Sequence, residues 1–394
     1  MNDHPLPDAD VAVIGLGAMG SMAAWQLAES GADVLGFEQY GLAHDRGAAG
    51  GESRLFRAAY HEGPEYVPLL RRARDMWIEL TESSGRPLFT PTGCLSVGLP
   101  DIDPMRNVRA SVDEHGLEHE ILGPDELTAR FPQHAPADGE IGILDAAGGM
   151  LRPELAVVTA LERARASGAR LLERTAVLAV EPDDAGVTVV TAERTWRVRR
   201  AVVTTGPWVR ELVPGAAVTP KPVVLTWFAP VRVQDYLPEV FPAFIRDTGG
   251  HHLFGCPVMD GVSVKAGVAD VWDPLADPRA LTRDLPEPAL APVTEAVRRL
   301  LPGLHPDPIR HGVYMDGYTA DRTALVGPAP GAPNVTVLAG FSGHGFKMAP
   351  VFGRVAADLV LEGGTAFDVA RMDPGRFSPA GAAARPAAPG PQAR

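Results

Sequence analysis

Apolar residues cluster in short unbroken runs near both ends of the chain. The runs at 10–14 and 34–38 have the length of buried strands, and residues 18–30 between them have a helical pattern that Gly31 ends. A similar order closes the chain, where an apolar run at 334–340 leads into glycines and a helical stretch at 341–363. Strand–helix–strand units of this kind predict a parallel sheet.

The middle of the chain is richer in strand patterns. We expect helices at 64–83, 103–115 and 288–301, a strand at 93–99, a helix, strand and hairpin after 148, and further strands within 219–311. Alternating Pro, Ala and Gly predict a disordered tail over 373–394. The predicted fold is α/β. A Rossmann-like dinucleotide domain over 8–82, 148–218 and 320–372 is interleaved with a β-rich α+β substrate domain over 83–147 and 219–319.

Composition narrows the class of protein. The 394 residues are 45% hydrophobic and 22% charged, which is typical of a globular enzyme. The net charge of −13 disfavours a nucleic-acid or anionic-membrane surface. No apolar stretch is long enough to span a bilayer, and the N-terminus does not resemble a secretory signal. Cys94 and Cys256 are too few for a disulfide framework or a zinc site, so we expect a cytoplasmic protein without a structural metal.

The basic residues are unevenly divided. The chain has 33 arginines and only three lysines, at 221, 265 and 347. Genome composition explains such a bias, but a lysine can lower its pKa when it is buried and an arginine cannot. A lysine retained in a cleft is therefore a candidate for chemistry.

A glycine motif joins the first predicted strand to its helix. It reads Gly15-Leu16-Gly17-Ala18-Met19-Gly20. In this pattern Gly15 allows a tight turn, Gly17 lets the backbone approach a pyrophosphate and Gly20 permits close helix–strand packing. Glu38 follows at the end of the second strand, where it can accept hydrogen bonds from a ribose. The motif predicts a bound dinucleotide and does not distinguish NAD from FAD.

Three further segments carry a family resemblance. Together with the glycine motif, residues 39–60, 201–208 and 334–347 resemble the monomeric sarcosine oxidase and N-methyltryptophan oxidase family of FAD-dependent amine oxidases, within the D-amino-acid-oxidase-like superfamily. The resemblance extends from about 8 to 370. It implies FAD contacts by Gly15, Gly17, Ala18, Met19, Gly20, Glu38, Gln39, Ser53, Arg54, Val177, Gly206, Trp208, Gly340, Gly343, His344, Gly345, Phe346 and Lys347.

The resemblance also implies roles for four cations. Arg54 lies beside the flavin, Arg57 and Lys347 bind the substrate carboxylate, and Lys265 promotes the reaction with oxygen by stabilising developing negative charge. Each has a plainer alternative. Arg57 can form a surface ion pair, Lys347 can be a water-exposed lysine at a helix start, and Lys265 can point outward from its strand. A first-turn lysine opposes the helix dipole, which favours an anionic partner for Lys347.

The flavin attachment site departs from the family pattern. Sarcosine oxidases bind FAD covalently through a cysteine in the segment that corresponds to 310–322, and this chain has Tyr314 at that position. Neither Cys94 nor Cys256 is near it in sequence. We therefore predict FAD that is bound without a covalent link.

Other departures concern the substrate pocket. Ala269 stands where the family has a histidine, and Leu253 stands for an active-site tyrosine, with one residue of uncertainty in the alignment. Asp316 replaces another tyrosine. It can hold a cationic amine or act as a base, or it can be an ordinary loop carboxylate. These changes predict a roomier, partly apolar pocket. His251 and His252 lack metal-ligand spacing and receive no role.

The combined hypothesis is an FAD-dependent oxidase of a carboxylate-bearing secondary or cyclic amine, either an N-methyl or an imino acid. It would form an imine and hydrogen peroxide, with Lys265, Arg54, Arg57, Lys347 and Asp316 as catalytic candidates. Its partners would be a small amine or amino acid and molecular oxygen, and the protein a monomer or weak homo-oligomer. The alternatives are an enzyme that aromatises a cyclic imino acid or tailors a secondary metabolite, an NAD-dependent dehydrogenase, and a non-catalytic flavoprotein.

Overall fold

A mixed sheet of eight strands forms one side of the molecule. The computed structural model describes residues 7–269 and 271–377. Parallel pairing joins the four central strands in the order β19–β12–β1–β2, and β9 extends the parallel part beyond β2. β10, β11 and β18 add antiparallel pairs. The strands are β1 (Ala9–Ile14), β2 (Val34–Phe37), β9 (Arg170–Leu172), β10 (Val177–Asp183), β11 (Gly186–Thr191), β12 (Thr195–Val203), β18 (Leu325–Ala329) and β19 (Ala332–Ala339). The predicted parallel sheet is confirmed.

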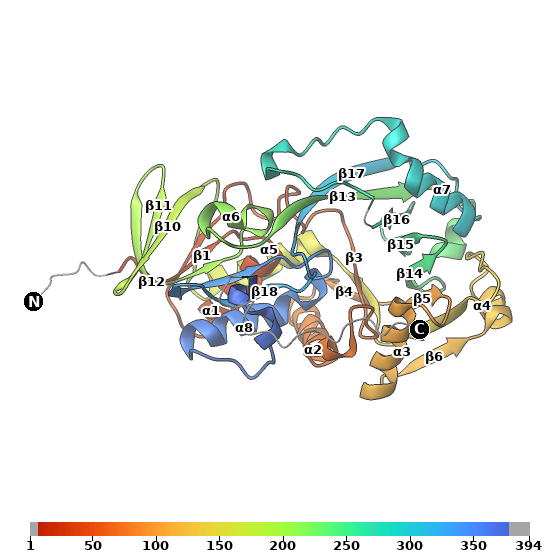
Figure 1. The fold of residues 1–394 in the computed structure, drawn as a ribbon, viewed down its shortest axis with the longest axis horizontal. Helices are drawn as coiled ribbons and strands as arrows, with labels where there is room; N and C mark the ends of the chain where they lie inside the picture. The colour runs from red at the N-terminus through yellow and green to blue at the C-terminus, as the bar shows by residue number, and fades with distance from the viewer. Residues whose placement is uncertain (1–6, 270, 378–394) are drawn as a thin grey trace, which may run out of the picture.

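Helices cover one face of this sheet (Figure 1). They are α1 (Ala18–Glu29), α2 (Val67–Ser84), α5 (Pro153–Ala166) and α8 (Ala349–Leu361). Their apolar faces form one core with the sheet, and α1 packs between α5 and α8. A Cβ at Gly353 of α8 would lie 2.6 Å from the backbone of Met22 in α1. This close approach fixes α1, and with it the turn that precedes the helix.

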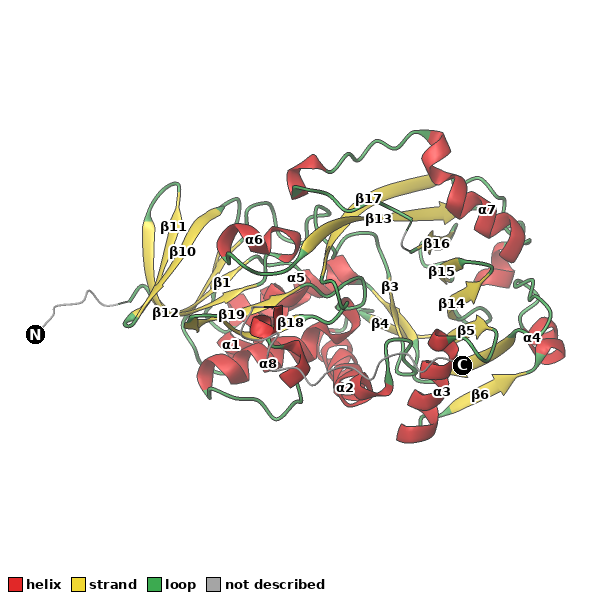
Figure 2. Cartoon of the chain, viewed as in Figure 1, coloured by secondary structure: helices red, strands yellow, loops and turns green. Residues whose placement is uncertain are grey.

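A second sheet of eight strands lies beside the first (Figure 2). Its order is β17–β13–β16–β15–β14–β5–β7–β6, antiparallel except for β14 against β5. α7 (Ala291–Leu300) packs its apolar face on it. The strands are β5 (Cys94–Gly98), β6 (His119–Leu122), β7 (Ile141–Asp145), β13 (Thr219–Phe228), β14 (Ala243–Thr248), β15 (His251–Cys256), β16 (Val264–Val268) and β17 (Arg310–Tyr318). A small sheet is formed by β3 (Arg54–Phe56), β4 (Phe89–Pro91) and β8 (Gly149–Leu151). It contacts the second sheet through β3 and α2 through β4.

Some element boundaries differ from the sequence prediction and others agree with it. The segment 64–83 is a 3-10 turn followed by α2, and 288–301 is a 3-10 turn followed by α7. The helix predicted at 103–115 is α3 (Asp103–His115). The predicted disordered tail starts too early, because Pro374–Phe377 form a 3-10 helix whose Arg376 is buried against Asp321. Residues 378–394 lie outside the described residues.

The proposed domain boundaries stay a prediction. Within residues 7–269 and 271–377, none of the helices has the length and hydropathy needed to cross a membrane.

Candidate active site

The turn between β1 and α1 has the geometry that its glycines predict. Gly15 has a φ of +86°, and a Cβ there would lie 2.9 Å from the carbonyl oxygen of Thr204. A Cβ at Gly20 would lie only 1.8 Å from the carbonyl oxygen of Gly15, so no side chain fits. A Cβ at Gly17 would meet nothing within 4 Å, because Gly17 faces an open cavity. The start of α1 is therefore accessible to a pyrophosphate.

Glu38 lies next to this turn with its carboxylate buried. Oε2 accepts a hydrogen bond from the backbone N–H of Leu16 at 2.9 Å, and Oε1 accepts one from Tyr40 at 3.0 Å. His44 Nε2 is 3.2 Å from Oε1. Burial opposes the charge, but His44 and the two backbone donors lower the pKa of Glu38 below its usual value. The carboxylate is thus a charged acceptor with lone pairs left for ribose hydroxyls.

A single cavity of about 420 Å³ extends from the glycine turn to the second sheet. Every predicted site residue lines it except Gly20, whose predicted role was packing. All three lysines of the chain also line it. Segments that are far apart in the sequence thus enclose one space that is large enough for an extended ligand.

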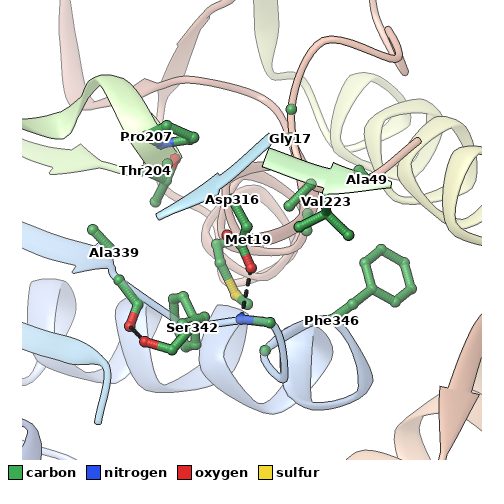
Figure 3. Close-up of a pocket in the computed structure, with 18 of the residues that line it drawn as sticks. Gly17, Met19, Ala49, Thr204, Pro207, Val223, Asp316, Ala339, Ser342 and Phe346 are labelled. Carbon is green, nitrogen blue, oxygen red and sulfur yellow. Dashed lines mark hydrogen bonds between the residues drawn. The ribbon is translucent and has the colours of Figure 1, made fainter. Parts of the chain in front are cut away.

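The loop after β19 closes one side of this cavity (Figure 3). Asp316 points from β17 toward this loop, where Oδ2 accepts a hydrogen bond from the N–H of Gly343 at 2.8 Å. Oδ1 accepts one from Gly317 at 2.7 Å. Burial raises the pKa of Asp316. Gly343 has a φ of +87°, and Ser342 donates its backbone N–H to Gly317 at 3.0 Å. Asp316 therefore holds the loop onto β17.

Tyr314, the residue that the family resemblance assigned to the flavin attachment position, does not line the cavity. Its ring packs so tightly that a Cβ at Gly50 would lie 2.6 Å from Cε1. Both cysteines are buried and neither lines the cavity. Burial raises the pKa of Cys94 to about 12 and also raises that of Cys256. None of the described residues that line the cavity is a cysteine. Non-covalent FAD stays a prediction.

Lys265 and Arg54 bind the carbonyl groups of the loop 48–53. Lys265 lies on β16 and is 3% exposed; its Nζ donates to the carbonyl of Gly51 at 3.2 Å and to that of Ser53. Arg54 donates to Ser53 at 2.8 Å and to Ala48 at 2.7 Å. Burial lowers the pKa of Lys265 to about 8. The side chain points into the cavity, so the outward alternative for Lys265 is wrong.

Arg57 is buried and already holds a carboxylate. Its NH2 donates to both oxygens of Glu62 at 2.9 Å, and its NH1 donates to Nδ1 of His61. Burial opposes the charge of Glu62, but Arg57, followed by His344 and Lys347, lowers its pKa to about 2. Arg57 thus forms an ion pair, yet one inside the cavity rather than on the surface.

Lys347 lies at the start of the segment that leads into α8 and is 6% exposed. Its Nζ donates to the carbonyl of His344 at 2.8 Å. Burial, followed by the charge of Arg57, lowers its pKa to about 7. Arg57 Cζ and Lys347 Nζ lie 4.8 and 5.2 Å from the centroid of the Tyr60 ring. Two buried cations therefore flank one aromatic ring, and the exposed alternative for Lys347 is wrong.

The second sheet supplies an apolar wall to the cavity. Ile245, Phe254, Val268 and Trp272 line it. Leu253, which was assigned to the family tyrosine, does not line the cavity. Strand alternation turns its side chain into the core of the second sheet and brings the neighbouring Phe254 to the cavity.

Several lining residues received no role from the sequence. Among them are Glu62, His252 and Trp272. Of the two adjacent histidines, only His252 lines the cavity. Ala269 also lines it, as expected for a roomier pocket.

Comparison with known proteins agrees with this architecture. Residues 10–359 match the family model described as DAO, FAD dependent oxidoreductase. The chain is 36% identical to monomeric sarcosine oxidase of Streptomyces avermitilis, over 95% of this chain and 99% of that protein. It is 32% identical to N-methyl-L-tryptophan oxidase of Salmonella dublin, over 94% and 99% of the two chains.

Solved structures show the same fold. NikD, an unusual amino acid oxidase essential for nikkomycin biosynthesis, has a TM-score of 0.81 at 25% identity, covering 93% of this chain and 97% of its own. L-proline dehydrogenase from P. horikoshii has a TM-score of 0.80 at 21% identity, covering 94% and 98%. The chain therefore belongs to the DAO family and is an FAD-dependent oxidoreductase similar to sarcosine and N-methyltryptophan oxidases.

Proposed function

We propose that this protein is an oxidase of carboxylate-bearing secondary or cyclic amines and binds FAD without a covalent link. The observation that carries the proposal is the pair of buried cations, Arg57 and Lys347, on the same cavity as the glycine turn. When bound, FAD supplies the acceptor for the two electrons of a C–H bond next to nitrogen and passes them to oxygen. The protein supplies binding, orientation and electrostatics.

Several residues fit FAD in the remainder of the cavity. The open backbone at Gly17 and the charged Glu38 suit the pyrophosphate and a ribose. Asp316 fixes the loop at Gly343, whose backbone lines the cavity. The described residues that line the cavity include no cysteine, so the cofactor would be held by these contacts alone.

Arg57 and Lys347 would bind the substrate carboxylate and thereby fix the amine in one orientation. A guanidinium and a carboxylate form charge-assisted bonds that strengthen when water is excluded. Glu62 already uses NH2 of Arg57, so an incoming carboxylate must displace Glu62 or share the guanidinium with it. Glu62 is thus an internal competitor of the substrate.

Lys265 would act in the reaction with oxygen. Its ammonium is buried and fixed by two carbonyl groups, so it is preorganised to stabilise the negative charge that develops when oxygen is reduced. A lysine whose pKa is about 8 remains mostly charged at neutral pH.

A second candidate function uses the same fold and the same cavity but forms a different product. An enzyme that oxidises a cyclic imino acid by two steps would aromatise it, and the wall of Phe254, Val268 and Trp272 with Ala269 leaves room for a ring. The structural similarity to NikD supports this alternative. Product analysis separates the two, since demethylation releases formaldehyde and ring oxidation does not.

Anaerobic titration of the purified protein tests the proposal. A panel of N-methyl and cyclic amino acids should bleach the flavin absorbance, and matched amines without a carboxylate should not. The flavin should leave the protein on acid precipitation. A protein that stays unbleached by the whole panel would refute the oxidase, and colour retained in the pellet would refute non-covalent binding.

A further inference from the structure

A polar pair lies at the apolar wall of the cavity, and its histidine, His252, lines that wall. Asp247 and His252 face each other across the β14–β15 hairpin, which turns at Gly249 and Gly250. His252 Nδ1 lies 2.6 Å from Asp247 Oδ1. The strand register puts both side chains on the face that also carries Ile245 and Phe254. The hairpin lies in the middle of the second sheet, between β16 and β5 (Figure 1).

The chemistry of the pair orients the imidazole. A carboxylate only accepts hydrogen bonds, so Nδ1 of His252 carries the proton. In the neutral ring Nε2 is then an acceptor. No group of the described residues bonds to this Nε2, and the His252 side chain is 35% exposed in the cavity. The pair therefore presents one oriented acceptor to a ligand.

A chain of contacts links this pair to the carboxylate-binding end. Asp247 Oδ2 lies 3.5 Å from His61 Nε2, and His61 Nδ1 accepts a hydrogen bond from Arg57. Arg57 in turn holds Glu62. The polar groups of Arg57 and His252 therefore belong to one connected set on the cavity wall.

We propose that His252, oriented by Asp247, recognises a hydrogen-bond donor that the substrate carries away from its carboxylate. Ligand pockets are mostly apolar, and a few placed polar groups in them decide orientation and selectivity. His252 is such a group among Ile245, Phe254 and Trp272. This inference rests on the proposed function and narrows its substrates to N-methyl or cyclic amino acids with a hydroxyl or ring N–H.

Calorimetry on the flavin-loaded protein tests the recognition without turnover. The probes are phenylacetate and its 2-, 3- and 4-hydroxy forms. At least one hydroxylated probe should bind about tenfold more tightly than phenylacetate, as one good hydrogen bond predicts. The advantage should fall below twofold in His252→Leu, recover in part in His252→Gln and weaken in Asp247→Asn. His251→Leu is the matched control, since His251 does not line the cavity, and it should keep the full advantage.

Two results would overturn the recognition: equal binding of all four probes, or an advantage that survives in His252→Leu. Flavin reduction by N-methyltyrosine and N-methylphenylalanine separates this inference from the oxidase itself. If His252→Leu loses the preference for hydroxylated probes but neither amine reduces the flavin, the recognition by His252 stands and the oxidase is refuted. Reduction of the flavin by these amines, with the same preference for hydroxylated probes in His252→Leu as in the unchanged protein, would support the oxidase and refute the recognition by His252.

Discussion

The two halves of the cavity are built in different ways. At the nucleotide end the backbone makes the site: a left-handed Gly15, an open Gly17 and a Gly20 packed against a carbonyl oxygen. At the substrate end side chains make it, with Arg57 and Lys347 buried at 5% and 6% exposure. The backbone at Gly15 and Gly20 leaves no room for a side chain, whereas buried charges depend on their partners. Substitutions at the nucleotide end should therefore destabilise the protein or release the cofactor. Substitutions at the substrate end should weaken substrate binding or slow the reaction.

The glycine turn should give the largest effect. Gly20→Ala puts a methyl group 1.8 Å from the carbonyl oxygen of Gly15, and neither backbone can move away freely. We expect a stability loss of about 3 kcal/mol or more. Melting temperature and flavin content measure it.

Gly17→Ala is the matched control for that variant. Its methyl group meets no protein atom within 4 Å, so the protein should keep its melting temperature as apoprotein and lose FAD affinity alone. Equal melting temperatures for Gly20→Ala and the unchanged protein would contradict the close packing of α1 on the turn.

Lys265→Met tests the oxygen reaction. The variant should be reduced by substrate at a similar rate and reoxidised about 100-fold more slowly, because a preorganised charge is lost. Anaerobic and aerobic stopped-flow absorbance measure the two half-reactions. Unchanged reoxidation would remove Lys265 from this role.

Arg57→Leu tests the carboxylate site. We expect KM to rise about 30-fold, since a charge-assisted hydrogen bond contributes about 2 kcal/mol. Glu62→Gln should act in the other direction and lower KM severalfold, because the internal competitor loses its charge. Steady-state kinetics give both values. A rise in KM for Glu62→Gln would show that Glu62 assists binding rather than competes.

Lys347 should make carboxylate binding depend on pH. Burial and Arg57 lower its pKa to about 7 in the free protein, so the ammonium is present below that pH and lost above it. Affinity for acetate should fall as pH rises through 7, by up to about tenfold per unit. Titrations at pH 6, 7 and 8 measure the fall, and Lys347→Met should abolish it. If Lys347→Met kept the same pH dependence of acetate binding, a group other than Lys347 would be responsible for it.

The nucleotide end of the cavity could be predicted from the sequence because the residues that form it are close together in the chain. Glycine spacing, the following helix and Glu38 lie within one strand–helix–strand unit, and each occupies the expected place. The family resemblance extended this to Lys265, Lys347 and Arg57, which line the same cavity.

The rest depends on contacts that the sequence does not display. The pairing of Arg57 with Glu62 needs a loop conformation, and that of Asp247 with His252 needs the register of a hairpin. Alternation along 251–256 separates His252 and Phe254 from Leu253, but the direction of the core decides which set faces the cavity. That direction is set by α7 and the remainder of the second sheet.

A crystal structure of the flavin-loaded protein with a bound carboxylate ligand tests the central claim most directly. We expect the pyrophosphate at Gly17, the flavin ring beside Lys265 and the ligand carboxylate between Arg57 and Lys347, with Glu62 moved from the guanidinium or sharing it. A ligand carboxylate bound away from both cations, or a cofactor outside this cavity, would contradict the account.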